Sequence, residues 1–194
     1  MLLPDKLKNT RLILGSASQR RLDLLRGLGL DFSVQVLNVP EDFSPALKRE
    51  QIAVYLAEKK AQSFAGSLEA NEILITADTI VWLEGTVLNK PADLDEARKM
   101  LSAISGKKHE VVTGVCLSSV SKTHSFFAVS EVHFKQLLPD EIEHYIQTYR
   151  PLDKAGAYGI QEWIGYIGVT SISGCYYNIM GLPLHDLYAE LIAF

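Results

Sequence analysis

The sequence predicts a mixed α/β fold, in which helices flank a β-sheet that contains parallel and antiparallel strands. A short apolar strand at 11–14 leads through a small-residue turn into a leucine-rich helix, and a nearly continuous apolar run at 72–83 is typical of a central strand covered on both faces. Apolar segments at 111–117 and 126–134, joined by a Ser/Thr-rich loop, indicate an antiparallel hairpin. A chain of 194 residues suits one substantial core or two lobes that share a cleft, so we expect a single domain over residues 1–194.

Before residue 72 the pattern predicts one further strand and two helices around a polar loop. The first helix runs from about Gln19 to Leu28, and alternating apolar residues at 32–36 indicate a half-buried strand. After the polar loop at 38–43, Ser44 is the expected N-cap of a long helix, with Pro45 at its first position.

The second half of the chain is predicted to alternate strands and helices in the same way. We expect, in order, a strand at 86–88, a helix capped by Asp93 and Glu96, a helix at 142–149 that Pro151 stops, a strand pair at 164–172 and 176–179, and a terminal helix opened by Pro183.

Composition excludes several classes of protein. Hydrophobic residues make up 47% and charged residues 22% of the chain, which is typical of globular proteins and not of disordered or fibrous ones. A net charge of −4 gives no general positive field, so we expect no nucleic-acid partner. Cys116 and Cys175 lack metal-ligand spacing, as in a reducing compartment, and no run approaches the ~20 apolar residues of a membrane span. We therefore expect a cytoplasmic protein without a membrane partner.

Asp78 is the least expected residue in the apolar run at 72–83. A carboxylate buried without a partner is costly, so Asp78 must meet a cation, a metal ion or several N–H donors, or face a cavity. An internal ion pair and a functional carboxylate are both consistent with this position. Its place towards the end of a strand, where α/β clefts open, favours function.

Three basic residues also lie in unusual places. Arg20 and Arg21 begin a helix, where the helix dipole disfavours cations, and a bound anion beside Ser16 would resolve the conflict. Lys60 falls within the apolar arc of its predicted helix, so its ammonium either extends along that surface to solvent or reaches an anion. Solvation is the alternative for both arginines.

Further charged residues stand at the ends of predicted elements. Asp153 and Lys154 lie in a glycine-rich loop, Lys90 precedes a proline, and Glu41 lies in the acidic loop. Each is also consistent with an ordinary surface charge. Carboxylates that bind a divalent cation and basic groups that bind phosphates suit a polyphosphate substrate, and no P-loop motif is present. The residues alone therefore predict a phosphate-handling α/β enzyme.

From about Arg11 to the C-terminal helix, the chain resembles the Maf family. The matching segments occur in order and with the expected spacing: SASQRR (16–21), LAEKKA (56–61), TADTIV (76–81), NKP (89–91), ISGKKHEVVTGV (104–115), PLDKAGAYGIQ (151–161) and GLPL (181–184). The resemblance implies an elongated mixed sheet with two lobes around a central cleft, similar to the inosine-triphosphate pyrophosphatases.

The resemblance also implies a reaction and its residues. A Maf protein hydrolyses the α–β phosphoanhydride of a nucleoside triphosphate to a monophosphate and pyrophosphate, with a divalent cation such as Mg²⁺ or Mn²⁺. By this resemblance Asp78 is the general base, and Glu41 and Asp78 are the metal-associated carboxylates. Ser16, Arg21, Lys60 and Lys90 are the implied phosphate-binding residues.

Arg20, Thr79 and Gln161 stand at the three positions that separate the Maf branches. They are similar to the branch that prefers dTTP, UTP and modified uridine triphosphates, whereas Trp, Gln and Glu mark the branch that prefers 7-methyl-GTP. Gly15 and Gln19 depart from the family's usual alanine and proline. The alternatives are another nucleotide substrate, such as 7-methyl-GTP, or a non-catalytic cell-division regulator that binds nucleotides. A homodimer is one of the assemblies that we expect.

Overall fold

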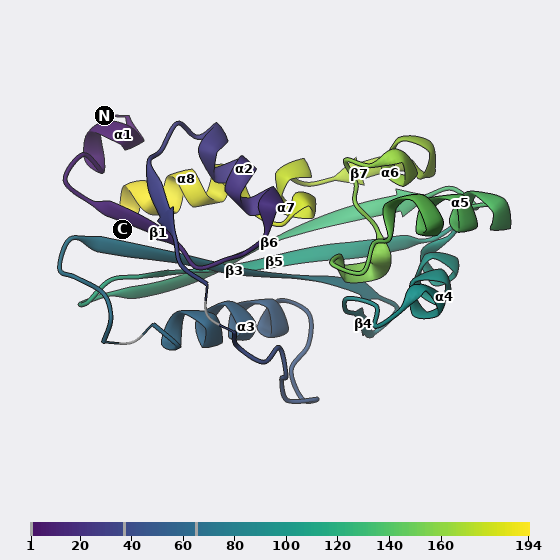
Figure 1. The fold of residues 1–194 in the computed structure, drawn as a ribbon, viewed down its shortest axis with the longest axis horizontal. Coiled ribbons are helices and arrows are strands. Elements are labelled where there is room, and N and C mark those ends of the chain that lie inside the picture. The colour runs from purple at the N-terminus through teal and green to yellow at the C-terminus, as the bar shows by residue number, and fades with distance from the viewer. Residues whose placement is uncertain (1, 37, 65) are drawn as a thin grey trace. The chain divides into compact units, whose positions relative to one another are not determined.

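The structure is a computed structural model that describes residues 2–36, 38–64 and 66–194 (Figure 1). The helices are α1 (Leu3–Lys6), α2 (Gln19–Gly27), α3 (Glu50–Gln62), α4 (Leu94–Ile104), α5 (Pro139–Tyr149), the 3₁₀ helix η1 (Ala155–Ala157), α6 (Trp163–Gly168), α7 (Tyr176–Met180) and α8 (Leu184–Ala193). The strands are β1 (Arg11–Leu14), β2 (Phe32–Val34), β3 (Glu72–Leu83), β4 (Thr86–Leu88), β5 (Lys108–Ser118), β6 (Thr123–Phe134) and β7 (Val169–Ser173).

The described strands form one seven-stranded mixed sheet, which confirms the predicted fold class. The order is β2-β1-β3-β5-β6-β7, and β4 pairs with β3 outside this path. β1 is parallel to both β2 and β3, whereas β4 pairs antiparallel with β3 and β7 pairs antiparallel with β6. The predicted β5–β6 hairpin is confirmed, with a tight connection closed by the Ser119 N–H donating to the Lys122 carbonyl at 2.8 Å.

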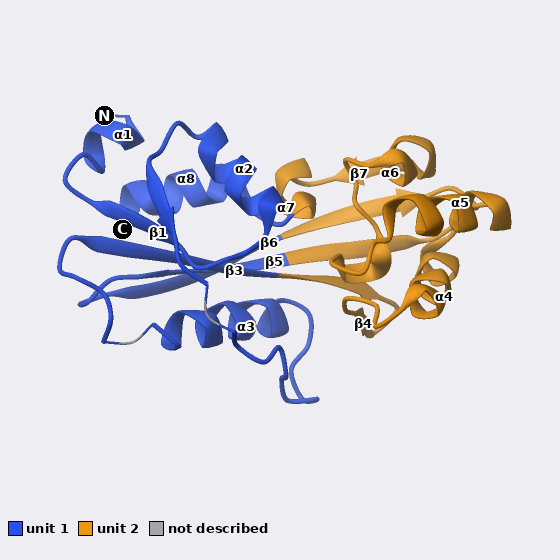
Figure 2. Ribbon diagram, viewed as in Figure 1, with its two compact units in different colours: residues 1–78, 113–128, 181–194 blue, residues 79–112, 129–180 orange. Residues whose placement is uncertain are grey.

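The chain divides into two compact units (Figure 2). Unit 1 contains residues Met1–Asp78, Thr113–Ala128 and Gly181–Phe194, and unit 2 contains Thr79–Val112 and Val129–Met180. The long strands β3, β5 and β6 each contribute residues to both units. The boundary in β3 falls between Asp78 and Thr79, two of the predicted site residues.

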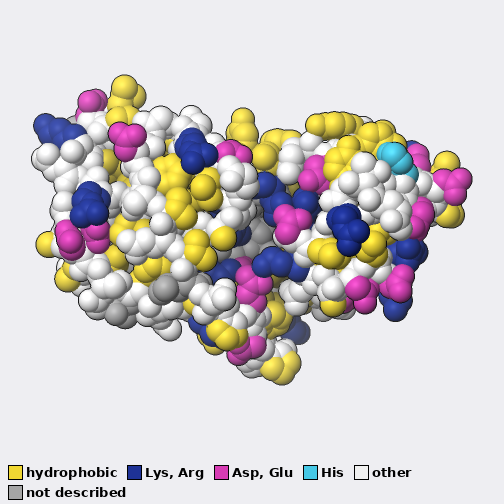
Figure 3. Space-filling view, viewed as in Figure 1, with side chains coloured by type: hydrophobic (Ala, Val, Ile, Leu, Met, Phe, Trp, Pro, Cys, Tyr) yellow, Lys and Arg dark blue, Asp and Glu magenta, His cyan; other side chains and the backbone are white. Residues whose placement is uncertain are grey.

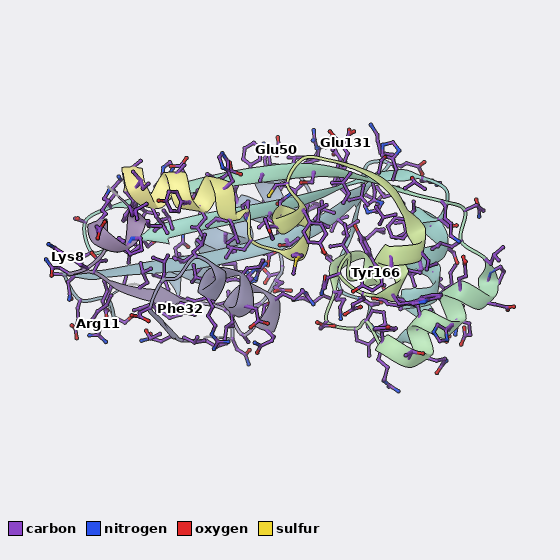
Figure 4. The ribbon with its side chains drawn as sticks, turned by 90° about the horizontal axis from the view of Figure 1, so that it is seen from above. Lys8, Arg11, Phe32, Glu50, Glu131 and Tyr166 are labelled. Atoms are coloured by element: carbon purple, nitrogen blue, oxygen red, sulfur yellow. The ribbon has the colours of Figure 1, made fainter. Side chains whose placement is uncertain are left out.

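In unit 1 helices cover both faces of the strands, with α3 on one face and α2 and α8 on the other (Figure 1). The α3 face is packed by Ile13, Leu74 and Cys116 from the strands against Ala57 and Phe64. β2 forms the edge beside β1, and the labelled Arg11 and Phe32 lie at this edge in Figure 4. Side chains two residues apart on a strand share a face, so Leu74, Thr76 and Asp78 all point towards α3.

Unit 2 has its own core beneath α4, α5 and α6. Val81, Leu101, Val132, Tyr145 and Ile164 are among the buried residues that form this core. The predicted cap of α4 is confirmed, because the Asp93 side chain accepts the Glu96 N–H at 2.8 Å. The unit therefore has an apolar centre to which the loop at 151–162 is attached.

Surface charge is mixed, and Lys and Arg side chains are interspersed with Asp and Glu on the face shown in Figure 3. This agrees with a net charge of only −4. No helix in the described part of the chain is long and apolar enough to cross a membrane.

The predicted start of the third helix at Ser44 and Pro45 is wrong, because α3 begins at Glu50. Ser44 instead closes a local turn, in which its hydroxyl accepts the Ala46 N–H at 3.3 Å and its carbonyl accepts the Leu47 N–H at 3.0 Å. Short hydroxyl side chains form such turns as readily as helix caps. Arg49, with a positive φ of 45°, then redirects the chain before the helix starts.

The predicted strand pair at 164–172 and 176–179 is also wrong. Residues 163–168 form α6 and residues 176–180 form α7, so that only β7 is a strand, and it pairs with β6. A short apolar run fits a buried helix as well as a strand. Gly165 permits the close packing of α6 on the preceding loop, because a Cβ at this position would lie 2.0 Å from the Ile160 carbonyl oxygen.

His109 is buried in unit 2 and predicts an acid-sensitive stability. Its Nε2 lies 2.7 Å from the Tyr158 hydroxyl, and burial, with a smaller effect of His133, lowers the pKa of His109 to about 4. In the unfolded chain a histidine binds its proton near pH 6.5, so the unfolded state binds more protons between pH 6.5 and 4. We expect the free energy of unfolding to fall by about 2–3 kcal/mol as the pH drops through this window.

The measurement is denaturant unfolding at several pH values with wild type and His109→Gln. The variant should lose the part of the pH dependence that His109 contributes between pH 6.5 and 4, whereas His185→Gln, at an exposed position, is the matched control. If the free energy of unfolding of His109→Gln changed with pH as steeply as that of wild type, His109 would not be the group responsible.

Candidate active site

Lys60 joins two carboxylates in unit 1. Its ammonium donates to Oδ1 of Asp78 and, at 2.9 Å, to Oε1 of Glu41. The Asp78 side chain is 9% exposed and that of Lys60 is 17% exposed, whereas Glu41, in the loop before α3, is 41% exposed. Lys60 therefore follows the second of its two predicted alternatives and meets an anion. The ion pair also explains how the burial of Asp78 is tolerated.

Arg21 and Ser16 form a second polar group beside this pair. The Arg21 Nε donates to the Gly181 carbonyl at 2.7 Å, and its Nη1 donates to Oγ of Ser16 at 3.4 Å. Burial lowers the pKa of Arg21, the charge of Arg20 lowers it further, and the charges of Asp78 and Glu41 oppose this change. The charges of Arg20, Asp78 and Glu41 therefore all act on the Arg21 guanidinium.

The start of α2 lacks the usual capping side chain and acidic residues. Ser18 is the N-cap residue but makes no side-chain cap, and no acidic residue stands in the first turn. Instead Oγ of Ser16 accepts the Ser18 N–H at 3.2 Å. A helix start that carries basic residues in place of acidic ones is an arrangement that favours anions.

Gln161 belongs to unit 2 and ends the glycine-rich loop. Its side-chain Oε1 is buried and has no hydrogen-bond partner among the described residues. Its backbone carbonyl accepts the hydroxyl of Tyr166 at 2.5 Å, and Tyr166, labelled in Figure 4, projects from α6 with 74% exposure. A buried amide oxygen without a partner is costly unless a ligand or water donates to it.

The loop that carries Gln161 is anchored at both ends. Lys154 is 7% exposed and pairs with Asp153 at 2.7 Å and with Glu162 at 3.2 Å. The Tyr145 hydroxyl donates to Glu162 and accepts the Gly159 N–H at 3.0 Å. Asp153 and Lys154 are therefore engaged with each other and with this loop.

The last two predicted site residues also belong to unit 2. Lys90 is exposed after β4, and the carbonyl of the preceding Asn89 accepts the Gly156 N–H at 3.2 Å. Thr79 is half-buried on β3, directly after Asp78. Both positions lie close in sequence to the antiparallel pairing of β3 with β4.

The model of the Maf family, described as Maf-like protein, matches residues 11–194. The chain belongs to the Maf family. Its sequence is 50% identical over 188 residues to the dTTP/UTP pyrophosphatase of Phocaeicola vulgatus, which covers 96% of this chain and 97% of that protein. The proteins of the same name from Porphyromonas gingivalis and Flavobacterium psychrophilum are 47% and 44% identical, and each match covers at least 96% of both chains.

Two solved structures have weaker likenesses to this Maf protein. The Staphylococcus aureus Ham1 protein matches 64% of this chain and 72% of its own, with 15% identity and a TM-score of 0.45. The nucleoside-triphosphatase, or dITP/XTP pyrophosphatase, of Mycobacterium abscessus matches 66% of this chain and 76% of its own, with 14% identity and a TM-score of 0.42. Likenesses of this size carry no information about residues or activity.

The predicted site residues of this Maf protein divide between the two units. Unit 1 brings together Ser16, Arg20, Arg21, Glu41, Lys60 and Asp78, whereas unit 2 contains Thr79, Lys90 and Gln161. The role of each residue stays a prediction. Two partners were not expected from the sequence: the Gly181 carbonyl that receives Arg21, and Asp42, which pairs with Lys59 at 2.7 Å. The sequence does contain one signal for the second contact: two adjacent acidic residues, Glu41 and Asp42, precede two adjacent lysines, Lys59 and Lys60.

Two carboxylates of unit 1, those of Glu41 and Asp78, have the oxygen-ligand chemistry of a divalent cation. Within the described ranges no group of three His, Cys, Asp or Glu side chains is arranged to hold a metal ion. Glu41 and Asp78 nevertheless converge on one nitrogen of Lys60. Mg²⁺ commonly binds through one or two carboxylates and takes its other ligands from phosphate and water. The two carboxylates therefore suit Mg²⁺ or Mn²⁺ that arrives with a triphosphate.

Proposed function

We propose that this Maf protein hydrolyses dTTP and UTP to the nucleoside monophosphate and pyrophosphate. The observation that supports the proposal most is the convergence of Asp78 and Glu41 on Lys60, with Arg21 and Ser16 beside them. This arrangement offers carboxylates and cations to one polyphosphate. The names of relatives that are 44–50% identical over nearly the whole chain support the same substrates.

In the proposed reaction Asp78 accepts the proton of the water that attacks the α-phosphorus. A carboxylate oxygen is a suitable base when it lies within hydrogen-bonding reach of the water and its other contacts hold it in place. Lys60, Arg21 and Lys90 offset the charge that develops on the departing pyrophosphate, and the hydroxyl of Ser16 donates to a phosphate oxygen. Lys60 must exchange a carboxylate partner for phosphate to take this role, because it is engaged with both carboxylates in the structure.

The proposed cofactor is a divalent cation held by Glu41 and Asp78. When bound, it supplies positive charge that polarises phosphate oxygens and favours deprotonation of water. The exposure of Glu41, 41% for its side chain, leaves this carboxylate accessible for such binding.

Gln161, with Arg20 and Thr79, is proposed to select the base. Uracil and thymine present a ring N–H donor between two carbonyl acceptors, and an amide side chain both donates and accepts. Oε1 of Gln161, which has no hydrogen-bond partner in the described part of the chain, provides an acceptor for such a donor. A buried group that needs a partner discriminates strongly against ligands that cannot supply one.

Gln161→Glu is therefore expected to reduce kcat/KM for UTP and dTTP by roughly 10- to 100-fold, because a carboxylate no longer donates to a base carbonyl. Steady-state kinetics with UTP, dTTP, CTP and GTP measure the change in preference. Gln62→Glu, at an exposed position of α3, makes the same substitution away from the predicted site and should keep the wild-type preference. Equal losses on all four nucleotides would show that Gln161 does not select the base.

The test of the function is a nucleotide panel with product identification. Purified protein with Mg²⁺ or Mn²⁺ should release pyrophosphate, not phosphate, from UTP and dTTP faster than from other triphosphates, including 7-methyl-GTP. Release of orthophosphate would contradict the reaction, and equal rates on all nucleotides would contradict the specificity.

A further inference from the structure

We propose that Thr76 is a positioning residue that sets Lys60 against Asp78, and that residue 15 is glycine because Thr76 requires the space. The inference rests on the proposed function, since it concerns how that site is held in shape. It concerns two residues of unit 1 to which no catalytic role has been given.

A single hydrogen bond of Thr76 connects the two elements that carry Lys60 and Asp78. Thr76 is completely buried in β3, and its Oγ1 donates to the backbone carbonyl of Ala57 at 2.7 Å. Thr76 lies two residues before Asp78 and therefore on the same face of β3. Ala57 lies three residues before Lys60, on the same side of α3. The bond thus fixes α3 along β3 one step away from the Lys60–Asp78 contact.

The separation between α3 and the sheet is fixed independently by Gly114 in β5. A Cβ at Gly114 would lie 2.4 Å from the backbone carbonyl of Ala53, so the helix backbone rests directly on this strand. A helix held this close can still slide or rotate by small amounts. The Thr76 bond removes that freedom at the turn of α3 that precedes Lys60.

Gly15 is matched to Thr76 by shape. The Gly15 N–H donates to the Ile75 carbonyl at 2.8 Å, so the backbone of residue 15 is tied to β3. A Cβ on Gly15 would lie 2.8 Å from Cγ2 of Thr76, too close for two carbons, and 3.3 Å and 3.4 Å from Leu74 and Phe64. In this structure an alanine at position 15 would therefore press its methyl group against Cγ2 of Thr76.

Thr76 cannot relieve such a clash without a cost to its hydrogen bond. The hydroxyl and methyl groups share Cβ, so a rotation that moves Cγ2 away from residue 15 also moves Oγ1 away from Ala57. A methyl group at residue 15 is thus expected to strain or displace the Thr76–Ala57 bond. Gly15 also immediately precedes Ser16, so the same contact sets the start of the predicted phosphate turn.

Four variants test this proposal through kcat and KM for UTP. Thr76→Val keeps the shape but removes the hydroxyl, and Gly15→Ala adds the clashing methyl; each should lower kcat by roughly 10- to 100-fold, because small displacements of reacting groups have effects of this size. Thr76→Ser keeps the hydroxyl without the methyl and should stay within about threefold of wild type. The double variant Gly15→Ala/Thr76→Ser should recover most of the activity that Gly15→Ala loses.

A buried truncation elsewhere in unit 1 distinguishes positioning from a general loss of stability. Val115→Ala, a buried truncation in β5, is the matched control and should lower the melting temperature while keeping kcat at an assay temperature well below unfolding. The proposal is overturned if Thr76→Val keeps the wild-type kcat, or if the double variant is as impaired as Gly15→Ala. Failure of the wild-type protein to release pyrophosphate would instead contradict the proposed function. In that case, a melting temperature that falls in Gly15→Ala and recovers in the double variant would still show that residues 15 and 76 are matched in shape.

Discussion

Asp78→Asn is expected to reduce pyrophosphate release from UTP by about 100- to 10,000-fold, the usual contribution of a general base. Asparagine has nearly the same shape but cannot accept the proton of the attacking water. KM should change less than kcat, because Lys60, Arg21 and Ser16 remain to bind phosphates. Pyrophosphate release at saturating UTP measures the effect.

Asp31→Asn is the matched control, since Asp31 is exposed and lies outside the predicted site. Melting temperatures close to that of wild type in both variants would exclude unfolding as the cause of the lost activity. An Asp78→Asn protein that retains more than a tenth of wild-type kcat would mean that another group takes the proton. If neither hydrolysis nor a cellular effect changed in this variant, the non-catalytic regulator would be favoured.

Removal of divalent cations is expected to have the second large effect. Excess chelator should abolish pyrophosphate release, and added Mg²⁺ or Mn²⁺ should restore it, because the proposed reaction requires a cation at Glu41 and Asp78. Glu41→Gln should raise the Mg²⁺ concentration for half-maximal rate by about tenfold, since loss of one carboxylate ligand weakens a hard-cation site.

The neighbouring residue provides a control with matched chemistry. Asp42 pairs with Lys59 and not with Lys60, and the hydrogen bond from Lys59 lowers the pKa of the Asp42 carboxyl. Asp42→Asn should therefore keep the wild-type Mg²⁺ dependence. Full activity in the presence of chelator, or equal shifts in Glu41→Gln and Asp42→Asn, would reject the cation site.

Periodicity and caps predicted the elements whose apolar pattern is long or whose ends carry specific residues. β3 and α4 are examples, because a 12-residue apolar strand has few alternatives and the Asp93–Glu96 cap is local. The start of α3 and the segment at 163–180 were predicted wrongly. There, Ser44 has two equally local hydrogen-bonding uses, and short apolar runs do not distinguish helix from strand.

The sequence predicted which residues belong to the candidate site better than it predicted the contacts between them. Asp78 and Lys60 stood out because each placed a charge in an apolar pattern, and the structure pairs them. No sequence pattern indicates that the Gly181 carbonyl receives Arg21, because that contact joins residues 160 positions apart. Likewise, the reason for glycine at position 15 is a contact with Thr76 that only tertiary packing creates.

The double engagement of Lys60 has a consequence for the order in which ligands arrive. Without nucleotide, the ammonium acts as an internal counter-ion for Glu41 and Asp78, so a dissolved cation has to displace it before it meets either oxygen. In the proposed reaction a triphosphate offers the ammonium another anion, and Lys60 exchanges a carboxylate partner for it. Affinity for Mg²⁺ in the absence of nucleotide should consequently be low, and each ligand should strengthen the binding of the other.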